Sequence, residues 1–357
     1  MHSKCHAKLA QVPDEAEAHC YIRLFRYQKR QEELSASLKT LHQSLASFRA
    51  KQDLFGQMNT LKCIGLVHCC LGEYAWGIKC LEQSWRIAQR MRKFISAGAI
   101  LNLLGTAYRQ TGQIEQALKT HRRAWVIFRD AGDQVGTAKT FNRLAEVHNS
   151  LGHPEQALRY ARPARNIFQD LGKFPEEEAT AVYNIAEAYS RLGRYRQALA
   201  LFEQALVIYA KSRQFSGKAK TLESMGKAYF KLGDCKRALQ FYQQALAIHR
   251  QRGDCLGSEV RCLDYLGAVH YKLGNYVFAI SYHLQALEAW RLPSCTNTDL
   301  FFDEQNVSDK YLIELKKVYQ YLGLSTEGKL CCEQVREIIR IYGDRVTQEA
   351  IRNYFQG

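Results

Sequence analysis

Three histidines recur at one position of a periodic pattern, and imidazole groups in register could act as metal ligands. They are His68, His148 and His270, and tyrosine fills the same position in the other three units of the pattern. Successive units would place equivalent side chains about the width of a helix pair apart, which is too far for one ion to bridge. We therefore expect these histidines to pack between helices.

Twelve cysteines give the chain a second set of reactive groups. Many of them stand at apolar helical positions, and no C-x-x-C spacing occurs. We expect small buried hydrophobic residues in a reducing compartment and not a disulfide framework. A loose group at the N-terminus, His2, Cys5 and His6, has metal-like composition, but a frayed terminus is the simpler interpretation. The sequence therefore predicts no metal site and no cofactor.

No catalytic arrangement emerges from the sequence, which lacks a Gly-rich phosphate loop, an H-E-x-x-H motif and a nucleophile elbow. We expect a protein without enzymatic activity. No run of 18 apolar residues occurs, and the first 20 residues lack a signal-peptide apolar segment, so we expect a cytoplasmic protein without membrane insertion. The net charge of +15 predicts an acidic partner.

The elements that position these side chains are repeats with a period of 40 or 41 residues. Each unit contains a glycine that would end its first helix: Gly72, Gly112, Gly152, Gly193, Gly233 and Gly274. A Gly or Ala stands seven residues before each of these glycines, and another stands five residues after it. Apolar residues at helical spacing on both sides predict two packed helices per unit. The expected fold is all-α, with each unit contacting its neighbours.

This pattern of a small residue, an aromatic three positions later and an alanine in the second helix resembles the tetratricopeptide (TPR) repeat. The period is longer than the usual ~34 residues of that family. It is similar to the long form in kinesin light chain, in Pins-type spindle adaptors and in cyanobacterial repeat proteins. The resemblance covers residues 17 to 345 and implies a right-handed superhelix of about eight helix-turn-helix repeats.

The predicted organisation has degenerate units at both ends. Residues 1–16 form a tail, 17–56 a degenerate repeat with helices near 17–31 and 43–56, and 57–291 six well-formed repeats. Residues 292–308 form an acidic-aromatic loop, and 309–357 a degenerate repeat with a capping helix. Residues 43–56 align with residues 122–136, pairing Phe48 with Phe128, Asp53 with Asp133 and Gly56 with Gly136. Asp133 and Asp254 are expected helix N-caps.

In the TPR family the first helix of each pair lines the concave face, and the resemblance carries those positions over to this chain. Basic residues then form rows along the groove, with amide and acidic residues between them. The implied ligand site comprises Asn102, Arg109, Lys139, Asn142, Arg143, Arg191, Lys220, Lys227, Lys231, Arg261 and Lys272. Such a groove suits an extended acidic peptide, because amides bind backbone groups and Lys and Arg bind carboxylates. An ordinary solvated helix face is the alternative.

Three other partner classes are weighed against this one. A chaperone-tail clamp would use Lys62, Lys139 and Arg143, but Leu66 and Leu103 stand where that clamp has asparagines. Nucleic acid could stack on groove aromatics such as Tyr183, Phe230 and Tyr271, but groove carboxylates would repel phosphate. A structural subunit or assembly factor of a larger complex, photosynthetic complexes among them, would dock through basic outer surfaces. The sequence leaves homo-oligomerisation open.

The residues of the predicted acidic-aromatic loop suggest a further hypothesis. Phe301, Phe302, Asp303 and Glu304 combine aromatic anchors with the charge that a basic groove accepts. We therefore consider them a possible ligand in cis, displaced by the true partner; a simple insertion is the alternative.

Overall fold

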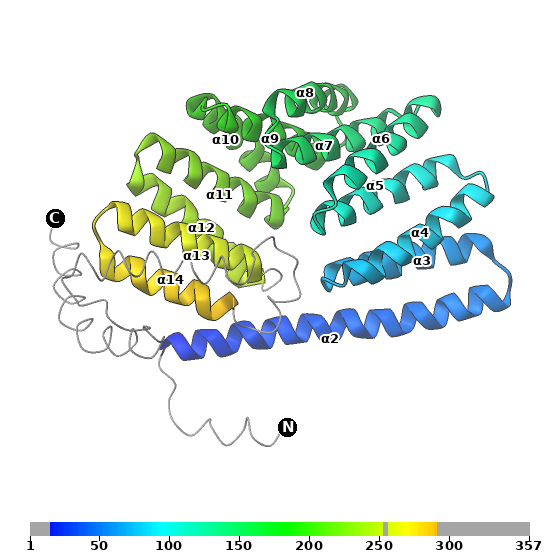
Figure 1. Ribbon diagram of the computed structural model, residues 1–357, viewed down its shortest axis with the longest axis horizontal. Coiled ribbons are helices and arrows are strands. Elements are labelled where there is room, and N and C mark those ends of the chain that lie inside the picture. Colours follow the sequence, from blue (N-terminus) through cyan, green and yellow to red (C-terminus); the bar gives the residue numbers. More distant parts are fainter. Residues whose placement is uncertain (1–14, 253–255, 291–357) are drawn as a thin grey trace, which may run out of the picture.

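The computed structural model describes residues 15–252 and 256–290 (Figure 1). This part of the chain contains thirteen α-helices and no strand, which confirms the all-α prediction. A long helix α2 (Glu15–Ala50) comes first. The other helices are α3 (Leu54–Cys70), α4 (Tyr74–Arg90), α5 (Phe94–Gln110), α6 (Ile114–Asp130), α7 (Gln134–Ser150), α8 (Pro154–Leu171), α9 (Pro175–Arg191), α10 (Tyr195–Lys211), α11 (Phe215–Leu232), α12 (Cys235–Arg252), α13 (Leu256–Lys272) and α14 (Tyr276–Trp290).

Helices α3 to α14 form six consecutive pairs that follow one another around an arch (Figure 1). Each helix packs against the next one in the chain, and each odd-numbered helix from α3 to α13 also contacts the next odd-numbered helix. This second set of contacts places the odd-numbered helices on the inner side of the curve. The array is thus a solenoid whose concave face is formed by the first helix of each pair. None of the described helices is both long and apolar enough to cross a membrane.

The backbone conformation of the turns within pairs explains why each repeat has a closing glycine. All six have positive φ, from 73° at Gly152 to 88° at Gly233. Glycine adopts this left-handed conformation at no steric cost and so ends the first helix. The four turns between pairs from α4 to α11 also contain a positive φ; two of them have glycine there, and two have an arginine, Arg92 with φ 55° and Arg213 with φ 56°. These two arginines hold a strained backbone that glycine would relieve.

Packing inside and between pairs depends on small residues beneath large ones. A Cβ added at Gly226 would lie 2.8 Å from Cε1 of Tyr242, so the ring rests directly on the glycine backbone. Phe128 covers Gly98 and Gly136 in the same way, which joins α6 to the helices before and after it. Alanines with no exposed surface fill the equivalent positions elsewhere. The small residues of the repeat are therefore required by close helix contact.

The N-terminal unit differs from the degenerate helix pair predicted for residues 17–56. One continuous helix, α2, runs over the region where a turn between two helices was expected. The segment between the two expected helices contains neither Gly nor Pro, and the closing Leu-Gly of other units is missing, so nothing ends the helix there. The end of α2 nevertheless behaves as predicted, because Phe48 covers Gly56 and the Asp53 carboxylate accepts a hydrogen bond from Gly56 N.

Two of the recurring histidines, His148 and His270, pack against rings of the neighbouring helix, as predicted. The His148 ring stacks on Tyr160 with centroids 5.5 Å apart, and the His270 ring stacks on Tyr282 at 5.4 Å. Burial lowers the pKa of both imidazoles. His68 lies 2.6 Å from a carboxylate oxygen of Glu73 in the following turn. The cysteines whose side chains are described are free thiols.

Candidate functional site

A hollow of about 330 Å³ lies on the concave face between α5, α7 and α9. Four of the predicted ligand residues line it, Asn102, Lys139, Asn142 and Arg143. The remaining lining consists of Ala99, Leu103, Thr106, Phe128, Gly136, Glu177 and Thr180. The hollow is therefore mixed in character, with an apolar wall and charged groups of both signs. Leu103 stands in it where the chaperone-tail clamp would require an asparagine.

Asn102 belongs to a hydrogen-bond network that joins three helices. Its amide nitrogen donates to Thr140 Oγ1 at 2.7 Å, and its amide oxygen lies 3.1 Å from His121 Nδ1. His121 is buried, and burial together with the nearby charges of Arg143 and Arg109 lowers its pKa to about 3. The imidazole is therefore neutral and donates to the amide oxygen. Both polar atoms of the Asn102 side chain are thus already used within the protein.

Asn142 is also part of the internal structure. Its side chain is 3% exposed, and its amide nitrogen donates to the backbone oxygen of Glu177 at 2.9 Å. Two further amides extend this link between α7 and α9, Asn184 donating to Asn142 O at 3.1 Å and Asn149 donating to Asn184 O at 2.9 Å. The prediction that the Asn142 amide binds peptide backbone stays untested, but the fold already engages the amide nitrogen that would do so.

Four of the predicted basic residues are paired with carboxylates inside the groove. The pairs are Lys139–Glu177 at 3.0 Å, Arg143–Glu146 at 3.1 Å, Arg191–Glu187 at 3.1 Å and Arg261–Glu223 at 3.4 Å. Each of these cations has much of its charge balanced before any ligand arrives. The paired residues come from all four helices α7, α9, α11 and α13. Most of the groove is consequently a lattice of ion pairs and not a uniformly basic surface.

Positive charge nevertheless converges around Glu146 at the centre of the groove. Burial alone would raise the pKa of this carboxyl group, but the charges of Arg143, Lys220 and Arg109 lower it to about 2. These cations come from α7, α11 and α5. The negative charge of Glu146 is therefore stabilised by three cations, of which Arg143 forms an ion pair with it.

The basic residues of α11 differ from the paired ones. Lys220, Lys227 and Lys231 are exposed, and none forms an ion pair with a carboxylate of the described residues. The Lys220 ammonium lies 4.6 Å from the centre of the Tyr183 ring. Lys272, on α13, lies over the Phe230 ring at 4.8 Å and donates to Phe230 O at 3.5 Å. Three groove lysines without an ion pair to a described carboxylate thus stand together on α11, and Lys272 stands on α13.

Glu177 is a groove residue that the sequence reasoning missed. It pairs with Lys139, lines the hollow and offers its backbone oxygen to Asn142. A signal for it existed in the repeat alignment, because equivalent positions hold a small residue in the other repeats, as at Gly136 and Gly217. A glutamate at a position that holds a small residue in the other repeats indicates that the helices pack less closely there.

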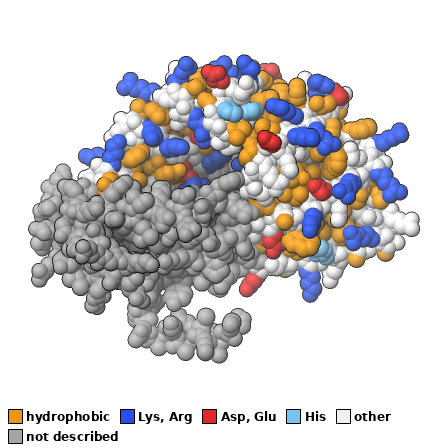
Figure 2. All heavy atoms as spheres, in the orientation of Figure 1, with side chains coloured by type: hydrophobic (Ala, Val, Ile, Leu, Met, Phe, Trp, Pro, Cys, Tyr) orange, Lys and Arg blue, Asp and Glu red, His pale blue; other side chains and the backbone are white. Residues whose placement is uncertain are grey.

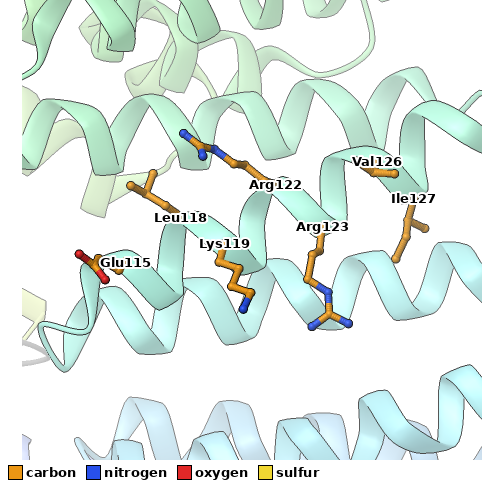
Figure 3. Close-up of a pocket in the computed structure, with 7 residues that line it drawn as sticks. All are labelled: Glu115, Leu118, Lys119, Arg122, Arg123, Val126 and Ile127. Atoms are coloured by element: carbon orange, nitrogen blue, oxygen red, sulfur yellow. The ribbon is translucent and has the colours of Figure 1, made fainter.

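Lys and Arg side chains are spread over the upper and right parts of the face seen in Figure 2. The even-numbered helix α6 carries an open hollow of about 660 Å³, and all the residues that line it belong to this helix. Lys119, Arg122 and Arg123 project from this helix beside Leu118 and Val126 (Figure 3). The Arg123 guanidinium lies over the Trp85 ring at 4.8 Å. This surface is the structural counterpart of the outer docking alternative.

The proposed cis ligand, Phe301, Phe302, Asp303 and Glu304, lies outside the described residues, as does the expected N-cap Asp254. Asp133 does cap α7, since its carboxylate accepts a 2.9 Å hydrogen bond from Gly136 N.

The family pattern described as tetratricopeptide repeat matches residues 96–170 and 177–251. No curated protein matches the chain.

Several solved structures share the fold at low sequence identity. The apo form of RapI has a TM-score of 0.60 and 14% identity, covering 76% of this chain and 97% of that chain. NprR in complex with its cognate peptide NprX has a TM-score of 0.57 and 16% identity, covering 88% and 91%. BtubC (BKLC) from P. vanneervenii has a TM-score of 0.51 and 19% identity, covering 59% and 89%.

Proposed function

This chain is a tetratricopeptide-repeat protein, and we propose that it is a non-enzymatic adaptor that holds an acidic segment of a partner protein along its concave face. The lysines of α11 are the main anchors in this proposal. The observation that carries it is that Lys220, Lys227 and Lys231 form no ion pair with a described carboxylate, whereas four other groove cations, Lys139, Arg143, Arg191 and Arg261, each form one. NprR, which shares the fold, was solved with its peptide ligand, and this supports a peptide as the kind of ligand.

The spacing of the three lysines limits the size of the acidic segment. Lys220, Lys227 and Lys231 are seven and four residues apart, which places them on one side of α11. They span about 16 Å along the helix. An extended peptide covers that distance with about five residues. We therefore propose a short ligand with at least two carboxylates, one for each end of the lysine row.

The hollow between α5, α7 and α9 supplies a second contact for the same ligand. Its apolar wall contains Leu103 and part of Phe128, and Lys139 and Arg143 stand beside that wall. A side chain that combines an apolar stem with a polar end fits such a lining. Because Asn102 and Asn142 already use their amide nitrogens internally, we assign recognition to the charged and apolar side chains and give these amides a supporting role.

The decisive experiment compares two charge-reversal variants of the full chain. In the first, Lys220→Glu/Lys227→Glu/Lys231→Glu alters the groove; in the second, Lys119→Glu/Arg122→Glu/Arg123→Glu alters the outer face of α6 by the same charge. Binding partners are captured under native conditions and identified by mass spectrometry. Circular dichroism establishes that both variants keep their helices.

Direct binding of a fluorescent oligoglutamate peptide provides the second readout. The proposal predicts that wild type binds it in a salt-sensitive manner, that the α11 variant loses binding and that the α6 variant keeps it. The captured partner should behave in the same way. Equal binding by wild type and the α11 variant in both assays would overturn the groove proposal.

A second function has its own supporting observation. The α6 surface, with Arg123 held over Trp85, provides a basic and partly apolar patch on the outside of the arch. A structural subunit or assembly factor would dock into a larger acidic complex through such a patch. Loss of a stoichiometric partner from the α6 variant alone would favour this function over the adaptor.

A further inference from the structure

A carboxylate, an imidazole and a thiol converge in the buried space between α11, α12 and α13. They belong to Glu223, His249 and Cys262, whose potential ligand atoms all lie within 4.8 Å of one another. The Nε2 atom of His249 is 2.6 Å from Oε1 of Glu223. All three residues are less than a tenth exposed. Among the side chains that the structure describes, this is the single group of three with such an arrangement.

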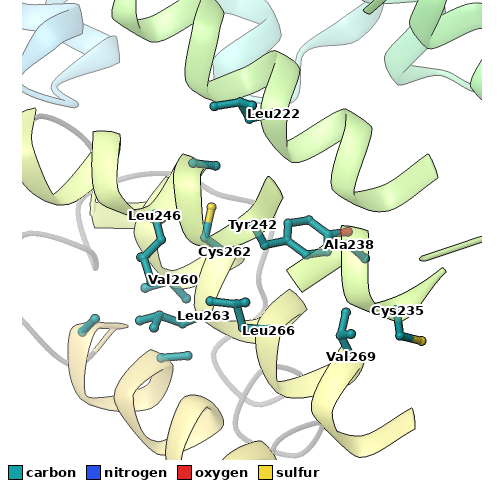
Figure 4. Close-up of a cluster of buried hydrophobic side chains, with 13 residues drawn as sticks. Leu222, Cys235, Ala238, Tyr242, Leu246, Val260, Cys262, Leu263, Leu266 and Val269 are labelled. Carbon is teal, nitrogen blue, oxygen red and sulfur yellow. The ribbon is translucent and has the colours of Figure 1, made fainter. Parts of the chain in front are cut away.

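The neighbourhood of the cluster is apolar. Cys262 lies in the core formed with Leu222, Tyr242 and Leu246, and its sulfur points toward α11 (Figure 4). A carboxylate in such a place requires partners that balance its charge. It has them in His249 and in Arg261, whose Nη2 lies 3.4 Å from the second oxygen, Oε2. Oε1 therefore faces the imidazole while Oε2 faces the guanidinium.

No other repeat places a carboxylate, an imidazole and a thiol together at the three equivalent positions, although Asp264 of the next repeat is equivalent to Glu223. The position of His249 holds an aromatic ring in other repeats, as at Phe128 and Phe168. The position of Glu223 holds asparagine in two of them, and the position of Cys262 holds threonine in three. The columns meet in space elsewhere too, since Asn102 donates to Thr140 Oγ1 at the equivalent place. The repeat geometry is thus general, whereas the set of ligating groups belongs to this unit.

We propose that Glu223, His249 and Cys262 form a zinc site that ties three consecutive helices together. Thiolate, imidazole and carboxylate are the ligands that Zn²⁺ accepts, and borderline-soft donors of this mixture disfavour Mg²⁺ and Ca²⁺. Tetrahedral coordination separates such donor atoms by about 3.4 to 3.6 Å. Side-chain shifts of about 1 Å therefore convert the hydrogen-bonded cluster into a coordinating one. A water molecule can supply the fourth ligand.

Charge and protons balance in the loaded site. The Cys262 thiol gives up its proton to solvent as the sulfur binds the ion. The proton held between Nε2 of His249 and Oε1 of Glu223 is also released to solvent when these two atoms bind the ion, and the neutral imidazole then carries its proton on Nδ1. The thiolate and the Glu223 carboxylate then offset the two charges of the ion. Arg261 keeps its contact with Oε2, the oxygen of Glu223 that does not bind the ion. It thereby fixes the orientation of the carboxylate, as residues that contact metal ligands commonly do.

Cobalt substitution tests the proposal on the full-length wild-type protein. The protein is purified in chelator-treated buffer with a reductant that contains no thiol, and it is titrated with Co²⁺. We expect one equivalent to produce the visible bands of tetrahedral cobalt and a thiolate-to-cobalt charge-transfer band, and Zn²⁺ to abolish both. Zinc should also raise the thermal unfolding midpoint of the metal-free protein. Absence of these bands in wild type would by itself overturn the proposal.

Variants that install residues from other repeats show which side chains bind the ion. His249→Phe keeps all twelve cysteines and places the ring found at Phe128, so it should fold and lose the cobalt bands. Glu223→Asn follows Asn102 and should weaken binding. Cys235→Ala removes another buried thiol and should leave the bands unchanged. If His249→Phe and wild type gave the same bands, the ion would be held by other cysteines and the assignment would be wrong.

Discussion

The free energy of unfolding of the wild-type protein should fall as the pH drops from 7 to 5, because His121 is buried beside groove cations. Replacing His121 with phenylalanine should remove this loss. The His121 ring rests on Gly105, where an added Cβ would lie 2.6 Å from Cε1 of the imidazole. Phe202 stands at the equivalent position of another repeat. Phenylalanine should therefore fit. The change removes the titrating group while keeping the packing of a ring over glycine.

The magnitude follows from the two pKa values of the imidazole. In the folded protein burial and the charges of Arg143 and Arg109 lower the pKa of His121 to about 3, whereas an unfolded chain has a value near ~6.5. Below ~6.5 the unfolded state therefore binds a proton that the folded state does not bind, so the free energy of unfolding decreases as the pH falls below that value. Between pH 7 and pH 5 the loss is about 1.9 kcal/mol. This figure does not depend on the folded value, provided that it lies below ~4.

The titration of Glu146 affects the free energy of unfolding mainly below the interval from pH 7 to pH 5. Its pKa is lowered to about 2, so the stability that it contributes is present above the unfolded value and is lost as the pH falls below ~4.5. The buried His148 and the partly buried His270 are present in wild type and variant alike, so their contributions cancel in the comparison. At neutral pH the variant loses the hydrogen bond to Asn102, at about 1 kcal/mol, so the slope with pH and not the absolute stability carries the prediction.

Urea denaturation followed by helical circular dichroism measures this slope at pH 7 and pH 5. Wild type should lose about 2 kcal/mol more than His121→Phe over this interval. The His121 imidazole signals in NMR spectra should also stay in their neutral position throughout it. Equal pH dependence of the two proteins, or an imidazole midpoint near ~6.5, would refute the reasoning about burial and groove charge.

Three further changes test the local structure by denaturation. Asp133→Ala removes the cap of α7 and should lower the free energy of unfolding by about 1 kcal/mol; an unchanged midpoint would mean that the cap bond contributes nothing. Gly136→Ala drives a methyl group into the Phe128 ring and should destabilise by about 1–3 kcal/mol. Tolerance of that methyl group would contradict the close packing. Arg213→Gly should raise the thermal midpoint, because the relief of a positive φ, worth about 1–2 kcal/mol, exceeds the entropy cost of glycine, about 0.5–1 kcal/mol. A lower midpoint would show that this backbone is not strained.

The sequence by itself determined the repeat and its local geometry. The closing glycines, the helix that each ends, the Asp133 cap and the requirement for small residues such as Gly226 at the close contact between paired helices could all be predicted. These features depend on residues within a few positions along the chain or on the same position in the next unit. Because the pattern occurs six times, the relation between nearby residues and the relation between equivalent positions can both be recognised in the sequence. The long helix α2 was missed because the alignment of its end implied a pair, although no residue between the expected helices could stop it.

Only the tertiary structure decided which groove charges are balanced. Lys139 meets Glu177 across 38 residues, and the Asn142 amide is engaged by a backbone oxygen 35 residues away. Such contacts depend on how far each repeat is rotated against the next, which the period along the chain does not specify. The same rotation brings Glu223 to His249 and Cys262 from three helices. The sequence supplied the charges and ligands, and the stacking of the repeats decided which of them meet.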